Sequence, residues 1–273
     1  MAEKIVDGST PEYSMGYSDE FQQLLKRRSA ETTAAHLIPL LKPGMRVLDF
    51  GCGPGTISVG LAKVVAPGEL HGIDLEESQV KLARAAAAAG GHDNATFHVA
   101  NATKLPFEDD SFDAAHCNAV LNHIPDTQTA LAEVKRVLKP GGIMFSRDWI
   151  SGANIWFPQP GTLGSAFDLF GALVEASDGH PYMGKELKNE FRLAGFTDIV
   201  TSVSYETYSS SEDVEFFHGW AVNYISRIAE RVIELGLGAQ SDIDGYLASL
   251  DEWKSHPGSF AGNPWGQAIG HKP

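Results

Sequence analysis

The residues best placed to do chemistry stand in the segment VLDFGCGPGTIS, residues 47–58, where a carboxylate precedes three closely spaced glycines. Gly51, Gly53 and Gly55 lack side chains where the backbone must turn sharply and where a ligand must lie directly against the main chain. Because an apolar run precedes the glycines and a helical pattern follows them, the segment predicts a strand, a turn and a helix N-terminus. We therefore expect a cofactor shelf at this turn.

The spacing of the glycines indicates which cofactor the shelf takes. Thr56 stands three residues after Gly53, where the dinucleotide fingerprint G-x-G-x-x-G has glycine or alanine. An NAD-linked dehydrogenase is therefore disfavoured. Asp49, at the end of the strand, would repel a pyrophosphate and attract the ammonium group of an amino acid. S-adenosylmethionine carries that ammonium group and no phosphate, so we expect it as the cofactor, with S-adenosylhomocysteine as the product.

The order of motifs along the chain resembles that of class I S-adenosylmethionine-dependent methyltransferases, in the branch of the ubiquinone and menaquinone C-methyltransferases (methyltransferase type 11). The resemblance is strong over roughly residues 40–148, and its motifs after the glycines are ELHGID, ATFHVAN, KLPFEDDSFD, AAHCNAVL, NHIPD and IMFSRDW. It implies methyl transfer, with carbon, oxygen and nitrogen acceptors all open, and the aromatic residues of the second half of the chain favour a small hydrophobic or aromatic metabolite as the acceptor.

The resemblance also implies a set of cofactor contacts. Asp74 lies nineteen residues beyond Gly55, close to the roughly 20-residue spacing at which an acidic residue binds the ribose hydroxyls. Helix capping is an alternative role for Asp74, and the two roles can coexist. Asn101 stands where the family commonly has an aspartate that accepts from the adenine amino group, and a neutral acceptor is weaker. The predicted cofactor-binding residues are Tyr17, Arg28, Asp49, Gly51, Cys52, Gly53, Gly55, Asp74, Leu75, Asn101, Ala102 and Asn118.

His123, which follows the fourth predicted strand, is the candidate catalytic residue. An imidazole with a pKa near ~6.5 can accept a proton from a hydroxyl or an amine at neutral pH. A purely structural histidine is the alternative, because an activated acceptor needs no strong base. The ten histidines are scattered, without H-E-x-x-H or paired cysteine spacing, so we expect no metal site.

The elements that must position these residues alternate between strands and helices from Met45 to Trp149, which predicts a mostly parallel sheet. Together with the resemblance, this pattern implies an α/β fold: a Rossmann-like, doubly wound, seven-stranded sheet with an antiparallel last strand, an N-terminal helical lid and a helical cap. One helical stretch is expected over roughly Ser18 to Leu41. The expected domains are a lid (1–43), a methyltransferase core with acceptor-side insertions (44–210), a helical cap (211–262) and a final core strand (263–273).

Composition limits the partners. The chain has 273 residues and a formal net charge of −14, which disfavours nucleic acid and anionic membranes as partners. No signal peptide or run of roughly 20 apolar residues appears, so we expect a cytoplasmic protein without stable membrane insertion. Cys52 and Cys117 are too few for a disulfide framework and are expected to be reduced thiols. A monomer and a homodimer both remain open.

Aromatic residues in the second half of the chain favour a small-molecule acceptor. Most must build the core of the cap, and some could line the acceptor pocket; they are Trp149, Trp156, Phe157, Phe167, Phe170, Phe216, Phe217, Trp220 and Tyr224. Tyr13 and Tyr17 precede the first predicted helix and could close over a sulfonium, since an aromatic face attracts a cation. The alternative from another class is a cofactor-binding protein that transfers no methyl group, either a scaffold or a pericyclase-type enzyme. The identity of the acceptor stays open.

Overall fold

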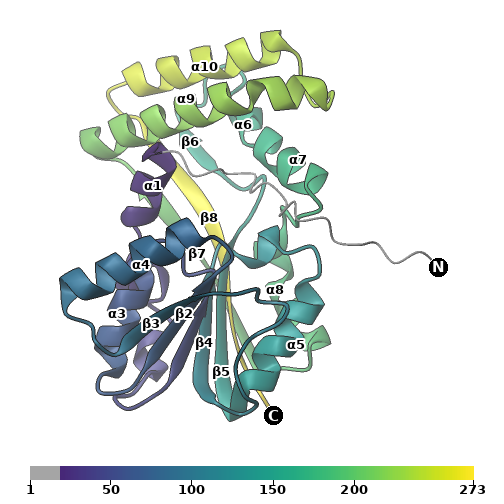
Figure 1. The fold of residues 1–273 in the computed structure, drawn as a ribbon. Coiled ribbons are helices and arrows are strands. Elements are labelled where there is room, and N and C mark those ends of the chain that lie inside the picture. Colours follow the sequence, from purple (N-terminus) through teal and green to yellow (C-terminus); the bar gives the residue numbers. More distant parts are fainter. Residues whose placement is uncertain (1–18) are drawn as a thin grey trace.

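Residues 19–273, which the computed structural model describes, form a sheet with helices on both faces and a helical pair above one edge (Figure 1). The strands are β1 (Val47–Phe50), β2 (Leu70–Asp74), β3 (Ala95–Val99), β4 (Phe112–Asn118), β5 (Leu138–Trp149), β6 (Ile155–Phe157), β7 (Thr197–Tyr208) and β8 (Phe260–His271). The α-helices are α1 (Asp19–Lys26), α2 (Ala30–Thr33), α3 (Thr56–Val65), α4 (Glu77–Gly90), α5 (Thr127–Val137), α6 (Leu163–Ala166), α7 (Asp168–Ala176), α8 (Met183–Leu193), α9 (Ser211–Glu234) and α10 (Gln240–Ser255). Two 3₁₀ helices are η1 (Ile38–Leu40) and η2 (Leu121–His123).

The sheet has the strand order β3-β2-β1-β4-β5-β8-β6, with β7 paired to β8. Strands β1 to β5 are parallel to their neighbours, whereas β8 is antiparallel to β5, β6 and β7. This topology confirms the predicted α/β class with an antiparallel last strand. The sheet has eight strands where seven were expected, because β6 forms within a segment expected to be a loop.

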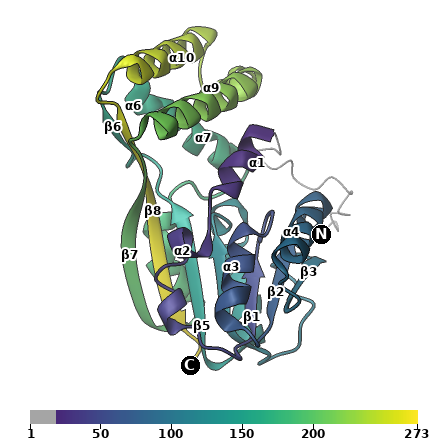
Figure 2. The same cartoon turned by 90° about the vertical axis from the view of Figure 1, so that its left-hand side faces the viewer.

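Two apolar layers hold helices against the sheet. Successive residues of a strand face opposite sides, and Val47 and Leu48 of β1 accordingly enter different clusters. Val47 packs with α2, α3 and α4, whereas Leu48 packs with α5 and α8. Figure 2 shows the first group of helices in front of the sheet. Parallel strands covered on both faces end at a common edge, where the glycine turn lies.

The single helical stretch predicted over residues 18–41 is wrong. The chain forms α1, α2 and η1 there, with breaks between them. Ser29 starts α2 as its N-cap, and Ser29 and Thr32 cap each other's backbone in a capping box. Ser29 therefore begins a new helix shortly after α1 has ended at Lys26. Tyr13 and Tyr17 lie outside the described residues, so the predicted lid and the predicted contact of Tyr17 stay predictions.

The helices α9 and α10 form an antiparallel pair above the carboxyl edge of the sheet, and the long strands β7 and β8 run from the sheet up to them (Figure 1). Phe217, Trp220 and Trp253 belong to the aromatic core of this pair. Ser210 begins α9 with a capping box to Asp213. Among residues 19–273, no helix is long and apolar enough to span a membrane.

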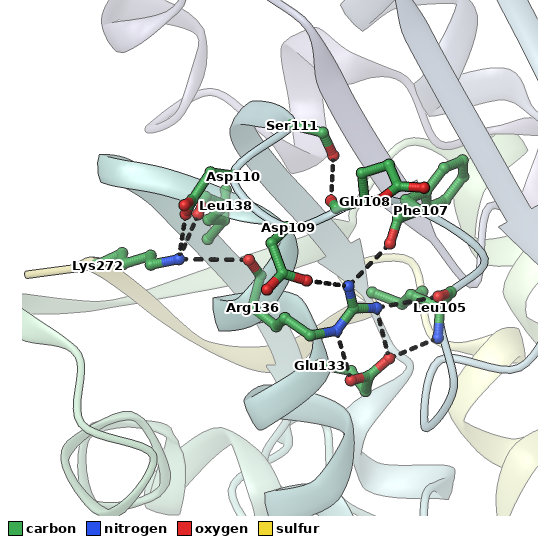
Figure 3. Close-up of polar contacts among 10 residues, drawn as sticks. All are labelled: Leu105, Phe107, Glu108, Asp109, Asp110, Ser111, Glu133, Arg136, Leu138 and Lys272. Atoms are coloured by element: carbon green, nitrogen blue, oxygen red, sulfur yellow. Dashed lines mark hydrogen bonds and ion pairs between the residues drawn. The ribbon is translucent and has the colours of Figure 1, made fainter.

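Arg136 of α5 fixes the segment that joins β3 to β4 (Figure 3). Its guanidinium donates to the carbonyl oxygens of Leu105 (3.0 Å) and Phe107 (2.8 Å), and to the carboxylates of Glu133 and Asp109. These partners raise the pKa of Arg136, because hydrogen bonds from Glu133 and Asp109 favour its charged form. Arg136 therefore holds the KLPFEDDSFD motif against α5, together with the hydrogen bond from Leu105 N–H to Glu133 and that from Lys272 to Asp110.

We expect Arg136→Met to lower the free energy of unfolding by about 1–3 kcal/mol, because the Leu105 and Phe107 carbonyls and the Asp109 carboxylate lose the hydrogen bonds from Arg136, and Glu133 keeps only that from the Leu105 N–H. Urea denaturation measures this change. Arg231→Met is the matched control: Arg231 makes only an exposed 3.6 Å ion pair with Glu234, and its loss should change stability by less than about 0.5 kcal/mol. Equal effects of the two substitutions would contradict the role of Arg136.

Candidate active site

The three glycines form a left-handed turn between β1 and α3. Gly51, Gly53 and Gly55 have φ angles of +67°, +52° and +80°, which favour glycine. A Cβ on Gly51 would lie 2.4 Å from Cγ2 of Val120, and one on Gly55 would lie 2.7 Å from Cβ of Ala83. A Cβ on Gly53 would meet nothing within 4 Å. Gly51 and Gly55 thus permit close packing inside the protein, whereas Gly53 has open space in front of it.

Asp74 binds this turn to the start of α4. One carboxylate oxygen accepts from the Gly53 N–H at 2.9 Å, and the other accepts from the Glu76 N–H at 3.0 Å. Burial raises the pKa of Asp74, although these backbone hydrogen bonds oppose the shift. The next residue, Leu75, is apolar but 52% exposed. The structure therefore shows the capping role of Asp74, and its predicted contact with a ribose stays a prediction.

Asp49 lies in the interior. Its carboxylate accepts from the Ser58 hydroxyl at 2.5 Å and is 2.7 Å from Nδ1 of His116, and only 2% of the residue is exposed. The His116 ring stacks on Phe145. Asp49 thus joins β1, α3 and β4, and its predicted contact with a cofactor ammonium stays a prediction.

The remaining predicted cofactor residues lie at the ends of β1, β3 and β4. The side-chain oxygen of Asn101 already accepts from the N–H and the hydroxyl of Thr103, each at 2.9 Å, and Ala102 is buried. The side-chain oxygen of Asn118 accepts from Arg147 at 3.0 Å. Cys52 is a buried free thiol, and burial raises its pKa. Cys117 is also free and buried.

A pocket with about 590 Å³ of empty space lies between the edge of the sheet and the helical pair. Its apolar lining comes from Leu24, Ala119, Trp149, Phe167, Phe170, Tyr208, Trp220 and Trp265, and its polar lining from Arg28, Asn122, His123, Glu206 and Asn263. Four aromatic residues singled out in the sequence line it, and most others pack in the cap; Phe157 is 58% exposed. Arg28 therefore lies with the pocket residues. The Thr56 hydroxyl donates to the Leu25 carbonyl at 3.2 Å, which ties the end of α1 to the glycine turn.

His123 lines the pocket beside Asn122, whose side-chain nitrogen is 3.2 Å from Nε2 of His123. Desolvation by burial, aided by the nearby positive charge of Arg28, lowers the pKa of His123 to about 4. The ring is therefore neutral at pH 7, and the ordinary pKa assumed from the sequence is wrong. Among residues 19–273, no group of three or more His, Cys, Asp or Glu side chains is arranged to hold a metal ion.

Asp148 supports the segment that carries His123. This fully buried carboxylate accepts from the Asn122 N–H at 3.2 Å and from the Ser146 hydroxyl at 2.7 Å. Burial raises the pKa of Asp148 to about 6. Sequence reasoning missed Asn122, Arg147, Asp148 and Glu206. Asn122 follows a parallel strand and Arg147 and Asp148 stand near the carboxyl end of another, which is where ligands bind, whereas Glu206 of β7 had no such signal.

A protein-family model described as a methyltransferase domain matches residues 41–195. The match spans more than half of the chain and contains the glycine turn, Asp74 and His123. This chain belongs to the methyltransferase-domain family. The helical pair above the pocket lies outside the matched stretch.

Individual methyltransferases are similar to parts of the chain. A probable methyltransferase of Aspergillus luteorubrus is 38% identical over 152 residues, which cover 52% of this chain and 53% of the relative. A demethylmenaquinone methyltransferase of Geobacillus kaustophilus is 33% identical over 172 residues, or 58% and 74% of the two chains. The chain thus spans about half the length of the Aspergillus relative. The structure of the YcgJ protein of Bacillus subtilis shares the fold, with a TM-score of 0.61, 21% identity and coverage of 87% and 97%.

The raised pKa of Asp148 makes the stability of this methyltransferase-domain protein depend on pH. The pKa rises from 3.8 to about 6 on folding, so between these values the folded protein binds more protons than the unfolded chain, and stability falls as pH rises. Relative to Asp148→Asn, the native protein should lose about 1–3 kcal/mol of unfolding free energy between about pH 4 and pH 6. Urea denaturation at both pH values measures the difference. Parallel pH profiles would show that Asp148 does not titrate in this range.

Proposed function

We propose that this methyltransferase-domain protein transfers a methyl group from S-adenosylmethionine to a small acceptor bound in the aromatic pocket. One observation carries the proposal: Val120 packs against the glycine turn, while its neighbours Ala119 and Asn122 line the pocket. The segment after β4 therefore separates the predicted cofactor shelf from the pocket by the width of a few side chains. Ala119 has a φ of +56°, a strained conformation for a residue other than glycine, and such strain is common at functional sites.

The cofactor fits the residues at the shelf. The open space in front of Gly53 allows a ligand to approach the main chain, and Leu75 offers an exposed apolar surface at the end of β2. Asp74 would accept from ribose hydroxyls by adding to, or exchanging, its present backbone bonds. When bound, the sulfonium supplies an electrophilic methyl carbon. The protein has to hold an acceptor atom in line with it and exclude water.

The pocket indicates the acceptor class. Its lining is largely aromatic with a few polar groups, as in many small-molecule sites. The Geobacillus relative is named for the methylation of demethylmenaquinone, whose name denotes a quinone-type acceptor. We therefore propose an apolar ring compound as the acceptor. The net charge of −14 supports a small-molecule acceptor over nucleic acid.

His123 is the proposed proton acceptor. A neutral imidazole with a pKa near 4 carries a proton on only one ring nitrogen at pH 7, so the other nitrogen can accept a hydrogen bond from an acceptor hydroxyl and take its proton as the new bond to the methyl carbon forms. Asn122 and Asp148 would fix the segment that orients the ring. A low pKa makes His123 a weak base, and this suits an acceptor that is itself acidic.

The roles of larger parts of the chain are also proposals. We propose residues 1–43 as the lid, 44–210 as the core, 211–262 as the acceptor-side cap and 263–273 as the strand that completes the core, in a cytoplasmic protein. The interior and pocket residues that come from β8 and from the cap support a cap that selects the acceptor. The names of the relatives favour transfer over a scaffold or a pericyclase-type enzyme.

A screen with methyl-labelled cofactor and a panel of phenols, naphthols and quinols tests the function. We expect label in at least one product, and we expect His123→Ala to lower turnover on that acceptor by about 10²–10⁴-fold with little change in cofactor affinity. His256→Ala is the control, because His256 lies in the connection after α10, outside the pocket lining. Cofactor binding without label in any product would favour the non-transferring alternative. A labelled product together with full activity of the His123→Ala enzyme would contradict the role of His123 as the base and leave the proposed methyl transfer intact.

A further inference from the structure

Two arginines contact the indole of Trp265, and of these two only Arg28 lines the pocket together with Trp265. The guanidinium carbon of Arg147 lies 4.0 Å from the centre of the Trp265 ring, and that of Arg28 lies 5.1 Å from it. Arg28 comes from the end of the first helical segment, whereas Arg147 and Trp265 come from the neighbouring strands β5 and β8. Arg147 is only 3% exposed. Elements distant in sequence therefore bring two positive charges to the same place.

The buried nitrogen atoms at this place are hydrogen-bond donors without acceptors. Nε of Arg28, Nε of Arg147, Nδ2 of Asn118 and Nε1 of Trp265 are buried, and none has a partner among the described residues. Each of them can only donate. Buried polar groups in proteins are nearly always paired, so four orphaned donors indicate a ligand that supplies acceptor oxygens.

The charge near these donors is mainly positive, which also favours an acceptor of negative charge. Glu206, the one acidic residue in the pocket lining, attracts Arg147 but forms no ion pair within 4 Å with either arginine. The Asp148 carboxylate already accepts from Ser146 and Asn122. Burial lowers the pKa of Arg147 to about 9, which leaves it charged at pH 7. Two cations therefore lie near one carboxylate of the pocket lining, and the excess of positive charge favours an anion.

We propose that Arg28 and Trp265, which line the pocket, bind an acidic oxygen group of the acceptor, a carboxylate or an ionised enol or phenol, with the help of Arg147 and Asn118 next to them. This proposal assigns Arg28 and Asn118, which the sequence predicted as cofactor contacts, to the acceptor. This inference rests on the proposed function and names its substrate class. Phe167, Phe170 and Trp220 supply the apolar end of the same pocket. The acceptor is therefore an aromatic acid whose charged group anchors it at Trp265 and whose ring body faces the cap.

Calorimetry with naphthalene-2-carboxylate and naphthalene-2-carboxamide tests the anion site without knowledge of the natural acceptor. The two probes match in size and differ in charge, and both are titrated into the cofactor-free protein at pH 7.5. We expect the carboxylate to bind about 10- to 100-fold more tightly, since charge-assisted hydrogen bonds are stronger. Arg147→Met should abolish this preference, and Arg192→Met, on the exposed face of α8, should keep it.

Glu206→Gln is the second variant, because Arg147 is buried and its removal can impair folding. Glu206 is partly exposed and repels an anion in the pocket, so Glu206→Gln should tighten naphthalene-2-carboxylate binding about threefold or more and leave the carboxamide unchanged. A merely structural role for Glu206 predicts weaker or equal binding of both probes. Equal affinity of the wild-type protein for the two probes overturns the proposal.

A titration of S-adenosylhomocysteine separates this inference from the proposed function. If Arg28→Met and Arg147→Met weaken S-adenosylhomocysteine binding tenfold but leave naphthalene-2-carboxylate unaffected, the arginines hold the carboxylate of the cofactor, and the acceptor site is overturned. If the wild-type protein binds S-adenosylhomocysteine but shows no preference for the acid, the inference fails while the proposed function stands. If it binds the acid and no S-adenosylhomocysteine, the proposed function fails and the anion site remains.

Discussion

The hydrogen bond between the Asp74 carboxylate and the Gly53 N–H is the interaction on which the candidate site depends. It holds a turn of three left-handed glycines against the start of α4, and the second oxygen of Asp74 begins that helix through Glu76. Gly51 and Gly55 allow Val120 and Ala83 to pack at distances that a side chain would forbid. Because the turn is fixed from both sides, the space in front of Gly53 is already shaped before any ligand binds.

The same constraint shapes the pocket beyond the turn. Val120 fills the space that Gly51 leaves, and this contact sets the course of the chain through Ala119 to His123. The Asp148 carboxylate fixes this segment by accepting from the Asn122 N–H. Protonation or substitution of Asp148 would weaken this hydrogen bond. The long strands β7 and β8 run up to the helical pair (Figure 2), and they contribute Tyr208 and Trp265 to the lining of the pocket. The predicted cofactor shelf and the proposed acceptor pocket consequently lie on opposite sides of the segment 119–123.

The features that depend on local sequence patterns could be predicted from the sequence. The glycine spacing, the strand that ends in Asp74 and the alternation of strands and helices indicated the sheet and its ligand-binding edge. The break at Ser29 and the strand β6 were missed, because a capping box competes with helical periodicity and a three-residue strand is defined only by its partner β8. Arg147 and Glu206 were missed for a similar reason: they are far apart in the chain, and only the pairing of β5 and β7 with β8 brings them to Trp265. The burial that lowers the pKa of His123 also depends on tertiary contacts.

Calorimetric titration of the protein with S-adenosylhomocysteine and with NAD tests the central claim most directly. The open glycine turn and the Asp74 carboxylate predict binding of S-adenosylhomocysteine and no binding of NAD, whose pyrophosphate would meet negative charge. Asp74→Asn should weaken S-adenosylhomocysteine binding by about 1–3 kcal/mol through loss of charge-assisted hydrogen bonds to the ribose. Binding of NAD in preference to S-adenosylhomocysteine, or an affinity for S-adenosylhomocysteine that is the same in a folded Asp74→Asn protein, would contradict the account.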